Sequence, residues 1–267
     1  MKKIVIFGNP VVHSKSPQMQ NAGLKYLNFD AVYEKFHLED GKELRNEFIK
    51  NDFLGANITV PHKEEAFVQA DEVVGIAKKI EAVNTYVKKD GKIYAYNTDA
   101  PGFLKAIESF GNVKKVLLLG AGGTAKAISL ALKENGFDVT VLNRSKNRLE
   151  FFQEFDIKTF SWDEFKEIFE NEKFDLVVNS TSAGLKDEEL PAPKEILDVV
   201  LQNSSFAFDC IYGKNTPFLA LARSFDNEIK DGEDMLLYQG ILAFELFTNT
   251  KADDGLVNAM RKGLKGK

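Results

Sequence analysis

The sequence predicts an α/β protein with mainly parallel sheets and two domains. Short apolar runs that suit buried strands alternate with segments of helical pattern, and this alternation is typical of parallel strands joined by helices. The chain has 267 residues, enough for two modest domains. Turn-forming residues near 100–112 and near Gly232 divide it into residues 1–102, 103–234 and 235–267. The apolar runs are 4–7, 56–60, 116–119, 139–142, 176–178 and 206–208.

The composition excludes several classes of protein. There are 35 Lys and Arg against 40 Asp and Glu, and no basic stripe interleaved with aromatics, which argues against a nucleic-acid partner. The first apolar run is too short for a signal peptide or a membrane span. A single cysteine, Cys210, and three histidines give neither an intramolecular disulfide nor a zinc-ligand pattern. We expect a cytoplasmic, metal-free protein that binds neither nucleic acid nor membranes and is a monomer or homodimer.

The first apolar run leads into a segment with two serines and the start of a helix. Ser16 before Pro17 has the form of an N-cap followed by a proline at the first helical position. The hydroxyls of Ser14 and Ser16, beside the free amides of a helix start, suit the binding of a small carboxylate. On spacing alone, a capped helix without a ligand is the favoured interpretation.

The run 56–60 leads into another helix, which places Lys63 in its first turn. The helix dipole disfavours a positive charge there, and this suits the ammonium to proton transfer. An ordinary surface lysine is an equal alternative.

Residues 84–99 predict a β-hairpin with a two-residue turn at 90–91. Counting back from that turn along both strands places Asn84 opposite Asn97, with Asp99 at the same end. An amide and a carboxylate together can bind the hydroxyls of a polyol and hold a proton-transfer group. Asp99 could instead cap the helix that follows it.

A glycine-rich segment with the pattern GxGxxA, residues 120–125, follows the apolar run 116–119 and precedes a predicted helix, 126–134. In a strand–turn–helix context this pattern indicates a dinucleotide site, where glycines allow a tight turn and close approach of the pyrophosphate. A glycine-rich turn without a ligand is the alternative. The residues expected at the pyrophosphate are Gly120, Ala121, Gly122, Gly123 and Thr124.

The next run, 139–142, ends in basic residues where an NAD-binding chain would carry an acid. Arg144 can form a bidentate ion pair with a 2′-phosphate, while Asn143 and Ser145 add neutral hydrogen bonds and Arg148 adds positive charge. The loop therefore favours NADP over NAD, although a solvated basic loop would have a similar composition.

With these residues in view, the chain resembles the shikimate dehydrogenase family along nearly its whole length. The matching residues are Ser14, Ser16, Pro17, Asn21, Asn57, Thr59, Pro61 and Lys63, then the segments 82–85, 97–99, 179–181, 209–212 and 235–240. The chain departs from the usual family pattern at Gln20, Asp234, Phe247 and Asn249.

The resemblance implies a shikimate-binding domain of residues 1–102, completed by helices from 235–267, and a Rossmann-like NADP domain of residues 103–234, with NADP in the cleft between them. It implies that Ser14 and Ser16 hold the carboxylate of the substrate, that Lys63 and Asp99 form the catalytic pair, and that Gly232 joins the cofactor residues. Further contacts to the carboxylate or the ring hydroxyls are implied for Thr59, Asn84, Tyr212 and Gln239.

The implied activity is reversible reduction of 3-dehydroshikimate to shikimate with NADP, in the pathway to the aromatic amino acids. Three alternatives share some of the motifs: a dehydrogenase with broader activity on quinate, a non-catalytic NADP-binding redox sensor, and a folate-type dehydrogenase of similar architecture. Clustered amides and paired serines suit a small polyol acid better than a pterin, and an intact Lys63 and Asp99 disfavour the sensor.

Overall fold

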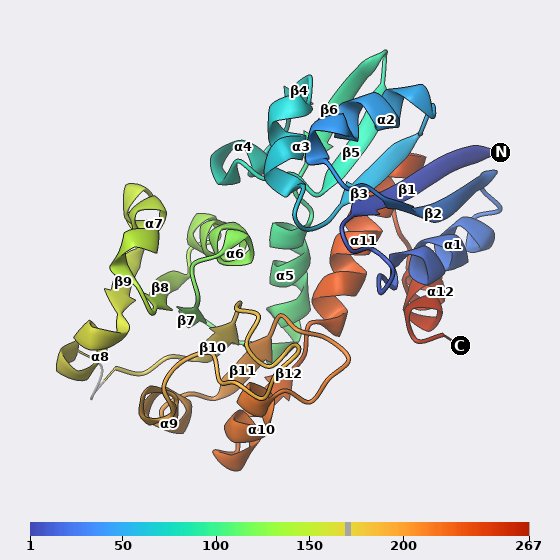
Figure 1. Ribbon diagram of the computed structural model, residues 1–267. Coiled ribbons are helices and arrows are strands. Elements are labelled where there is room, and N and C mark those ends of the chain that lie inside the picture. Colours follow the sequence, from blue (N-terminus) through green and yellow to red (C-terminus); the bar gives the residue numbers. More distant parts are fainter. Residues whose placement is uncertain (169–171, 267) are drawn as a thin grey trace. The chain divides into compact units, whose positions relative to one another are not determined.

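The computed structural model describes residues 1–168 and 172–266 (Figure 1). The chain divides into two compact units, one formed by Met1–Gly102 together with Leu236–Lys267 and the other by Phe103–Met235. It passes from the first unit to the second within helix α5 (Asp99–Ile107), and returns within α11 (Glu233–Thr248). Across residues 1–168 and 172–266, no helix is both long and apolar enough to cross a membrane.

The first unit is built on a mixed sheet with the strand order β2-β1-β3-β5-β6-β4. Strands β1, β2 and β3 are parallel, whereas β5 is antiparallel to both β3 and β6. Besides α5 and α11, its elements are β1 (Lys2–Gly8), α1 (Ser16–Tyr26), β2 (Ala31–His37), η1 (Gly41–Glu43), α2 (Leu44–Lys50), β3 (Gly55–Ile58), α3 (Lys63–Gln69), β4 (Glu72–Val73), α4 (Ala77–Ile80), β5 (Thr85–Lys89), β6 (Lys92–Tyr96) and α12 (Asp254–Leu264).

Alternate side chains of β1 enter two different cores, because successive residues of a strand point to opposite faces of the sheet. Ile4 and Ile6 pack with α1, α11 and α12, whereas Val5 and Phe7 pack with residues of α2 and α3. Figure 1 shows α1 and α12 side by side on one face and α2 and α3 on the other. The C-terminal helices therefore belong to the core of the first unit.

The second unit has a parallel sheet with the order β12-β11-β10-β7-β8-β9. This is the doubly wound order, in which ligands bind beyond the carboxyl ends of the two strands where the winding direction changes, here β7 and β10. Its elements are η2 (Glu108–Phe110), β7 (Lys115–Leu119), α6 (Gly123–Glu134), β8 (Asp138–Asn143), η3 (Lys146–Arg148), α7 (Glu150–Glu154), β9 (Lys158–Ser161), α8 (Trp162–Ile168), β10 (Leu176–Asn179), α9 (Lys194–Gln202), β11 (Phe206–Asp209), α10 (Pro217–Ser224) and β12 (Glu228–Lys230).

Each of the six apolar runs contains a strand, although β3 ends at Ile58, two residues before the end of the run 56–60. The α/β prediction is confirmed. In the described part of the chain, the strands that neither these runs nor the hairpin pattern predicted are β2, β4, β9 and β12, which are the outermost strands of the two sheets. Outer strands have one unpaired edge and more exposed side chains, so they lack the continuous apolar pattern of central strands.

A buried carboxylate fixes the chain after β11. Asp209 is fully buried and accepts hydrogen bonds from Asn179 Nδ2 at 3.1 Å, the amide of Ile211 at 2.9 Å and Thr216 Oγ1 at 2.6 Å. Thr216 also caps α10 by accepting from the amide of Leu219. Burial raises the pKa of Asp209, and these donors oppose part of that rise.

Replacing Thr216 with valine should lower the free energy of unfolding by about 2–4 kcal/mol at neutral pH, because it removes a helix cap and a donor to a buried carboxylate. A raised folded pKa contributes stability that is present below the unfolded pKa and lost as the pH rises through the folded value. The variant raises that pKa of Asp209 further, so its deficit should be larger at neutral pH than at about pH 4. Urea denaturation at both pH values measures this, with Thr216→Ser as the control that keeps both bonds. If the loss of stability in Thr216→Val is the same at both pH values, the loss of the helix cap alone explains it and the bond to Asp209 contributes nothing.

A glycine sets the distance between α5 and α11 in the first unit. A Cβ added to Gly102 would lie 2.7 Å from the backbone nitrogen of Gln239 and 2.9 Å from its Cα. Alanine normally stabilises a helix relative to glycine. Here the backbones have no room for it.

Gly102→Ala should therefore lower the free energy of unfolding by about 1–3 kcal/mol despite the gain in helix propensity. Asn258→Ala, on an exposed position of α12, is the matched control and should change stability by less than about 0.5 kcal/mol. Chemical denaturation compares the two variants. A Gly102→Ala protein as stable as the parent would show that the helices separate at no cost.

Candidate active site

Two loops from the carboxyl ends of β1 and β3 lie side by side in the first unit. A Cβ added to Gly8 would lie 2.4 Å from Thr59 Cγ2, so only glycine permits this approach. The amide of Asn9 donates to the carbonyl of Val60 at 3.2 Å, which ties the loops together. The serine segment and the segment leading to Lys63 are thus neighbours, as expected where parallel strands end at one edge of a sheet.

The predicted N-cap role of Ser16 is wrong. Helix α1 begins at Ser16 itself, and the N-cap position is Lys15, which makes no side-chain cap. Ser14 takes the capping part instead, because its Oγ accepts from the amide of Ser16 at 3.2 Å. Ser16 is buried and Ser14 is half-buried, so the two hydroxyls have different surroundings.

Lys63 and Asp99 are in contact. Lys63 is the first residue of α3, and its Nζ lies 2.6 Å from Oδ2 of Asp99. The alternative in which Asp99 caps α5 is wrong, because Asn97 Oδ1 accepts from the amides of Asp99 and Ala100 at 3.1 and 3.3 Å. The amide side chain of Asn97 therefore leaves the Asp99 carboxylate available to the lysine. Both groups keep some solvent access, 29% for Lys63 and 18% for Asp99.

The hairpin has the predicted register, with Lys89 paired to Lys92. Both turn residues, Asp90 and Gly91, have positive φ, as a two-residue turn of this kind requires. The strands end at Thr85 and Tyr96, so that Asn84 and Asn97 follow at one end.

Asn84 is buried and its amide orientation is set by its neighbours. Its Oδ1 accepts from the amide of Thr98 at 2.8 Å and from Thr85 Oγ1 at 2.9 Å, while its Nδ2 donates to Thr98 Oγ1 at 3.0 Å. Thr98 Oγ1 also lies 3.5 Å from Oε1 of Gln239 on α11. Thr98 thus links two predicted substrate residues. The sequence signal for Thr98 was its place in the matching segment 97–99, beside Asp99.

The glycine-rich loop lies at the carboxyl end of β7, next to β10. Gly120 has a φ of 103°, and an added Cβ would lie 2.7 Å from Thr181 Cγ2, so this position requires glycine. Cβ atoms added to Gly122 and Gly123 would meet no atom within 4 Å, which leaves room for a ligand. Helix α6 begins at Gly123 rather than at the predicted residue 126, so the amides of the loop itself form the helix start.

The basic loop follows β8, where Nδ2 of Asn143 donates to the carbonyl of Ser145 at 2.9 Å. Arg144 and Arg148 are exposed, and no carboxylate of the described residues forms an ion pair with either of them. Lys146, by contrast, pairs with Glu164 at 2.6 Å. Two guanidinium groups thus remain available for an anion.

Tyr212 and Gly232 lie close to one another along two joined segments of the second unit. The amide of Gly232 donates to the carbonyl of Ile211 at 3.0 Å, and a Cβ on Gly232 would lie 2.3 Å from the carbonyl oxygen of Cys210. Burial raises the pKa of the half-buried Tyr212. These residues follow β11 and β12 in turn.

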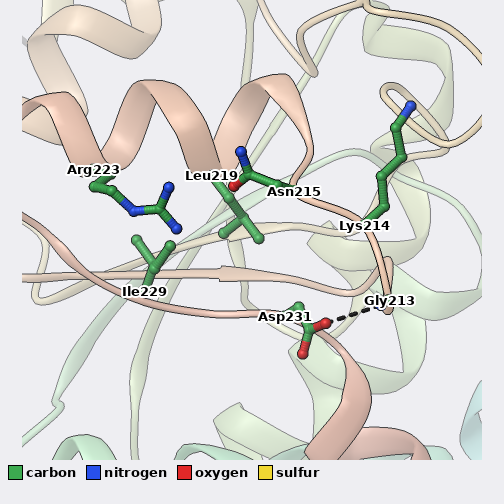
Figure 2. Close-up of a pocket in the computed structure, with 7 residues that line it drawn as sticks. All are labelled: Gly213, Lys214, Asn215, Leu219, Arg223, Ile229 and Asp231. Carbon is green, nitrogen blue, oxygen red and sulfur yellow. Dashed lines mark hydrogen bonds between the residues drawn. The ribbon is translucent and has the colours of Figure 1, made fainter.

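A pocket of about 360 Å³ lies beside these two segments (Figure 2). Asp231 fixes one side of it, because its carboxylate accepts from the amides of Gly213 at 2.9 Å and Glu233 at 3.1 Å. Asp231 thus braces both the loop after Tyr212 and the turn at Gly232. The residues that line the pocket are Gly213, Lys214, Asn215, Leu219, Arg223, Ile229 and Asp231.

The four departures from the family pattern are accommodated locally. Gln20 is buried and donates to the carbonyl of Gly240 at 2.9 Å, and Phe247 packs against Gly55, where an added Cβ would overlap its ring. Oδ2 of Asp234 lies 3.3 Å from Nζ of Lys230, the last residue of β12. Asn249 has a φ of 54° just after α11, a conformation that asparagine tolerates nearly as glycine does.

Family models match most of the chain. Residues 6–86 match "Shikimate dehydrogenase substrate binding domain", residues 105–189 match "Shikimate / quinate 5-dehydrogenase", and residues 232–264 match "Shikimate 5'-dehydrogenase C-terminal domain". A relative named shikimate dehydrogenase (NADP(+)), from Helicobacter hepaticus, is 42% identical over 96% of this chain and 94% of its own length. One of the same name from Bacillus cereus is 34% identical, with 91% of each chain covered.

Solved structures agree with these matches. A shikimate 5-dehydrogenase from Thermus thermophilus, in complex with NADP(H) and shikimate, has a TM-score of 0.86 at 35% identity, covering 98% of this chain and all of its own. Shikimate dehydrogenase from Aquifex aeolicus has a TM-score of 0.86 at 34% identity, with 97% of each chain covered. On sequence and structure alike, this chain belongs to the shikimate dehydrogenase family.

Proposed function

We propose that this protein reversibly reduces 3-dehydroshikimate to shikimate with NADPH, as a step in the synthesis of aromatic amino acids. The observation that carries the proposal is the contact of Lys63 with Asp99, at 2.6 Å, in the unit that also holds Ser14, Asn84 and Gln239. A proton-transfer pair is what a carbonyl reduction requires beyond the hydride donor.

The polar groups of the first unit suit a small polyol acid. The Oδ1 of Asn84 is occupied by two donors, so its second N–H is what it can offer to a ligand. Gln239 is similar, because Nε2 donates once to Leu236 O at 2.8 Å and Oε1 lies near Thr98. Asp99 supplies an acceptor. Hydroxyl and carboxylate oxygens of a polyol acid match this set of donors and acceptor.

We assign the carboxylate of the substrate to the serine segment, with Thr59 beside it. Ser14 Oγ already accepts from the amide of Ser16, so its own proton is free to be donated to a carboxylate. Tyr212 is assigned to the substrate from the second unit.

The second unit fits NADP. The glycine loop leaves open space at Gly122 and Gly123 for a pyrophosphate at the start of α6, and Arg144 and Arg148 suit the 2′-phosphate. Bound NADPH would supply a hydride, which carries two electrons to carbon 3 of the ketone. Asn143, Ser145 and Gly232 complete the residues that we assign to the cofactor.

The proton step belongs to Lys63. As the ketone is reduced, negative charge develops on its oxygen, and the Lys63 ammonium is suited to donate a proton to that oxygen. The Asp99 carboxylate holds the ammonium in place and stabilises its charge before the transfer. In the reverse direction Lys63, as the free amine, takes the proton from the hydroxyl.

A direct assay tests this proposal against its alternatives. NADPH formation is followed at fixed NADP with shikimate, with quinate and with neither, and turnover with shikimate is expected to exceed that with quinate. Greater turnover with quinate would make the protein a quinate dehydrogenase. No turnover with either acid, together with tight NADP binding, would support the redox sensor.

Lys63→Ala and Asp99→Asn should each lower the turnover number by roughly 100- to 10,000-fold while the protein still folds and binds NADP, because each removes half of one proton-transfer unit. The turnover number of the double variant should be little lower than that of the less active single variant, since the effects of residues that act as a unit are not additive. Steady-state assays at saturating shikimate and NADP measure this. Lys92→Ala, which breaks an exposed ion pair with Glu72 in the same unit, is the control. If the fold-losses of the two single variants multiply in the double variant, Lys63 and Asp99 act independently and the coupled pair is refuted.

Arg144→Ala should weaken the binding of NADP by about 1.5–3 kcal/mol, which raises its Kd roughly 10- to 150-fold, because it removes a charge-assisted bond to the 2′-phosphate. The binding of NAD, which lacks that phosphate, should weaken much less. The matched control is Arg223→Ala, which removes an exposed arginine from the same unit. Arg223 lines the pocket of Figure 2 and lies outside the basic loop. Calorimetric titration with both cofactors gives the ratio. Equal losses for NADP and NAD in Arg144→Ala would refute the assignment.

A further inference from the structure

A buried tyrosine lies beneath the serine segment and outside every motif of the sequence. Tyr33, on β2, is 1% exposed, and its hydroxyl donates to Oδ1 of Asn57 at 2.7 Å. Burial raises the pKa of Tyr33 well above its ordinary value, and a side-chain hydrogen bond with Ser16 opposes only part of that rise. The phenol therefore remains a proton donor at any physiological pH.

Helix α1 holds this tyrosine in place through Asn21, a motif residue to which the proposed function gives no part. Nδ2 of Asn21 donates to the Tyr33 carbonyl at 2.9 Å, and its Oδ1 accepts from the Tyr33 amide at 2.9 Å. Because β2 is an outer strand, these backbone groups have no neighbouring strand on that side. The side-chain amide of Asn21 forms the two hydrogen bonds that a neighbouring strand would otherwise form.

The bond from Tyr33 is the first of a series in which each side chain donates to the next. Asn57, 6% exposed, donates through Nδ2 to Thr85 Oγ1 at 3.1 Å and to the carbonyl of Asn84 at 3.2 Å. Thr85 Oγ1 donates to Asn84 Oδ1 at 2.9 Å, and Asn84 Nδ2 donates to Thr98 Oγ1 at 3.0 Å. A hydroxyl has one proton, so the direction of each bond fixes that of its neighbour.

The series ends at the groups that would face a ligand. Asn84 keeps its oxygen inside the network and one N–H outside, and Thr98 lies within 3.5 Å of Oε1 of Gln239. Without the phenol of Tyr33, Oδ1 of Asn57 would lose its buried donor. The side-chain amide of Asn57 would then lose its fixed orientation.

We propose that Tyr33 is a positioning residue of the substrate site, which through Asn57 and Thr85 orients the Asn84 amide as a donor towards an oxygen of the polyol acid. This inference deepens the proposed function and rests on it. Tyr33 touches neither substrate nor cofactor in this scheme, and acts only through the residues between.

The test compares two buried phenols of the same sheet. Tyr33→Phe removes the first donor of the series, whereas Tyr86→Phe removes an equally buried phenol that donates to the Ala66 carbonyl instead. Both should lower the melting temperature. Only Tyr33→Phe should raise the KM for shikimate, by roughly 3- to 12-fold as expected for one hydrogen bond, with the KM for NADP unchanged. An equal shikimate KM in the two variants overturns the proposal, because the tyrosine would then act on stability alone.

Thr85→Val, which is nearly isosteric, tests the middle of the series and replaces Tyr33→Phe if that variant fails to fold. It should raise the shikimate KM as well, and the double variant should match the larger single effect. An unchanged KM in Thr85→Val, or effects that multiply in the double variant, overturns the proposal. If the parent protein does not turn over shikimate, the proposed function fails; an active parent with unaffected variants refutes only the role of Tyr33.

Discussion

The side chain of Asn84 joins segments that lie far apart in the sequence, and the arrangement of the first unit's polar residues depends on it. Its oxygen takes the amide of Thr98 and the hydroxyl of Thr85, and its nitrogen meets the Thr98 hydroxyl, which in turn lies near Gln239. Asp99 is the next residue along, so the same bonds set where its carboxylate lies. A buried amide left unpaired is costly, and that cost makes this arrangement specific.

In each unit, the side-chain oxygen of an asparagine or aspartate accepts hydrogen bonds from backbone amides beside a proposed ligand-binding residue. Asn97 accepts the first amides of α5, and Asp99 is thereby free to meet Lys63. In the second unit Asp209 and Asp231 accept the backbone amides around Tyr212 and Gly232. Asn97, Asp209 and Asp231 thus hold the backbone beside residues that are assigned to ligands, and are not themselves assigned to one. Substitution of these three residues should disturb geometry before it disturbs chemistry.

Strands at the centre of each sheet were readable from the sequence, and strands at the margins were not. A central parallel strand is covered on both faces, so it appears as an apolar run. The outer strand β2 carries Glu34 and Lys35 between its apolar residues and was missed, and Tyr33 was missed with it. The mistaken cap at Ser16 has a related cause. Ser-Pro spacing fixes where a helix starts only to within a residue, and the identity of the capping oxygen depends on how the preceding loop folds.

The sequence by itself determined the fold class, the hairpin register, the glycine loop and the choice of NADP, because each depends on residues within a few positions of one another. The glycine pattern of 120–125 and a loop of Asn143 to Arg148 without an acid are both visible in short stretches of sequence. The contact of Lys63 with Asp99, and the series from Tyr33 through Asn57 to Asn84, are seen only in the tertiary structure. Those contacts join residues as many as 36 positions apart, and hydrogen-bond direction there is set by neighbours that no local pattern contains.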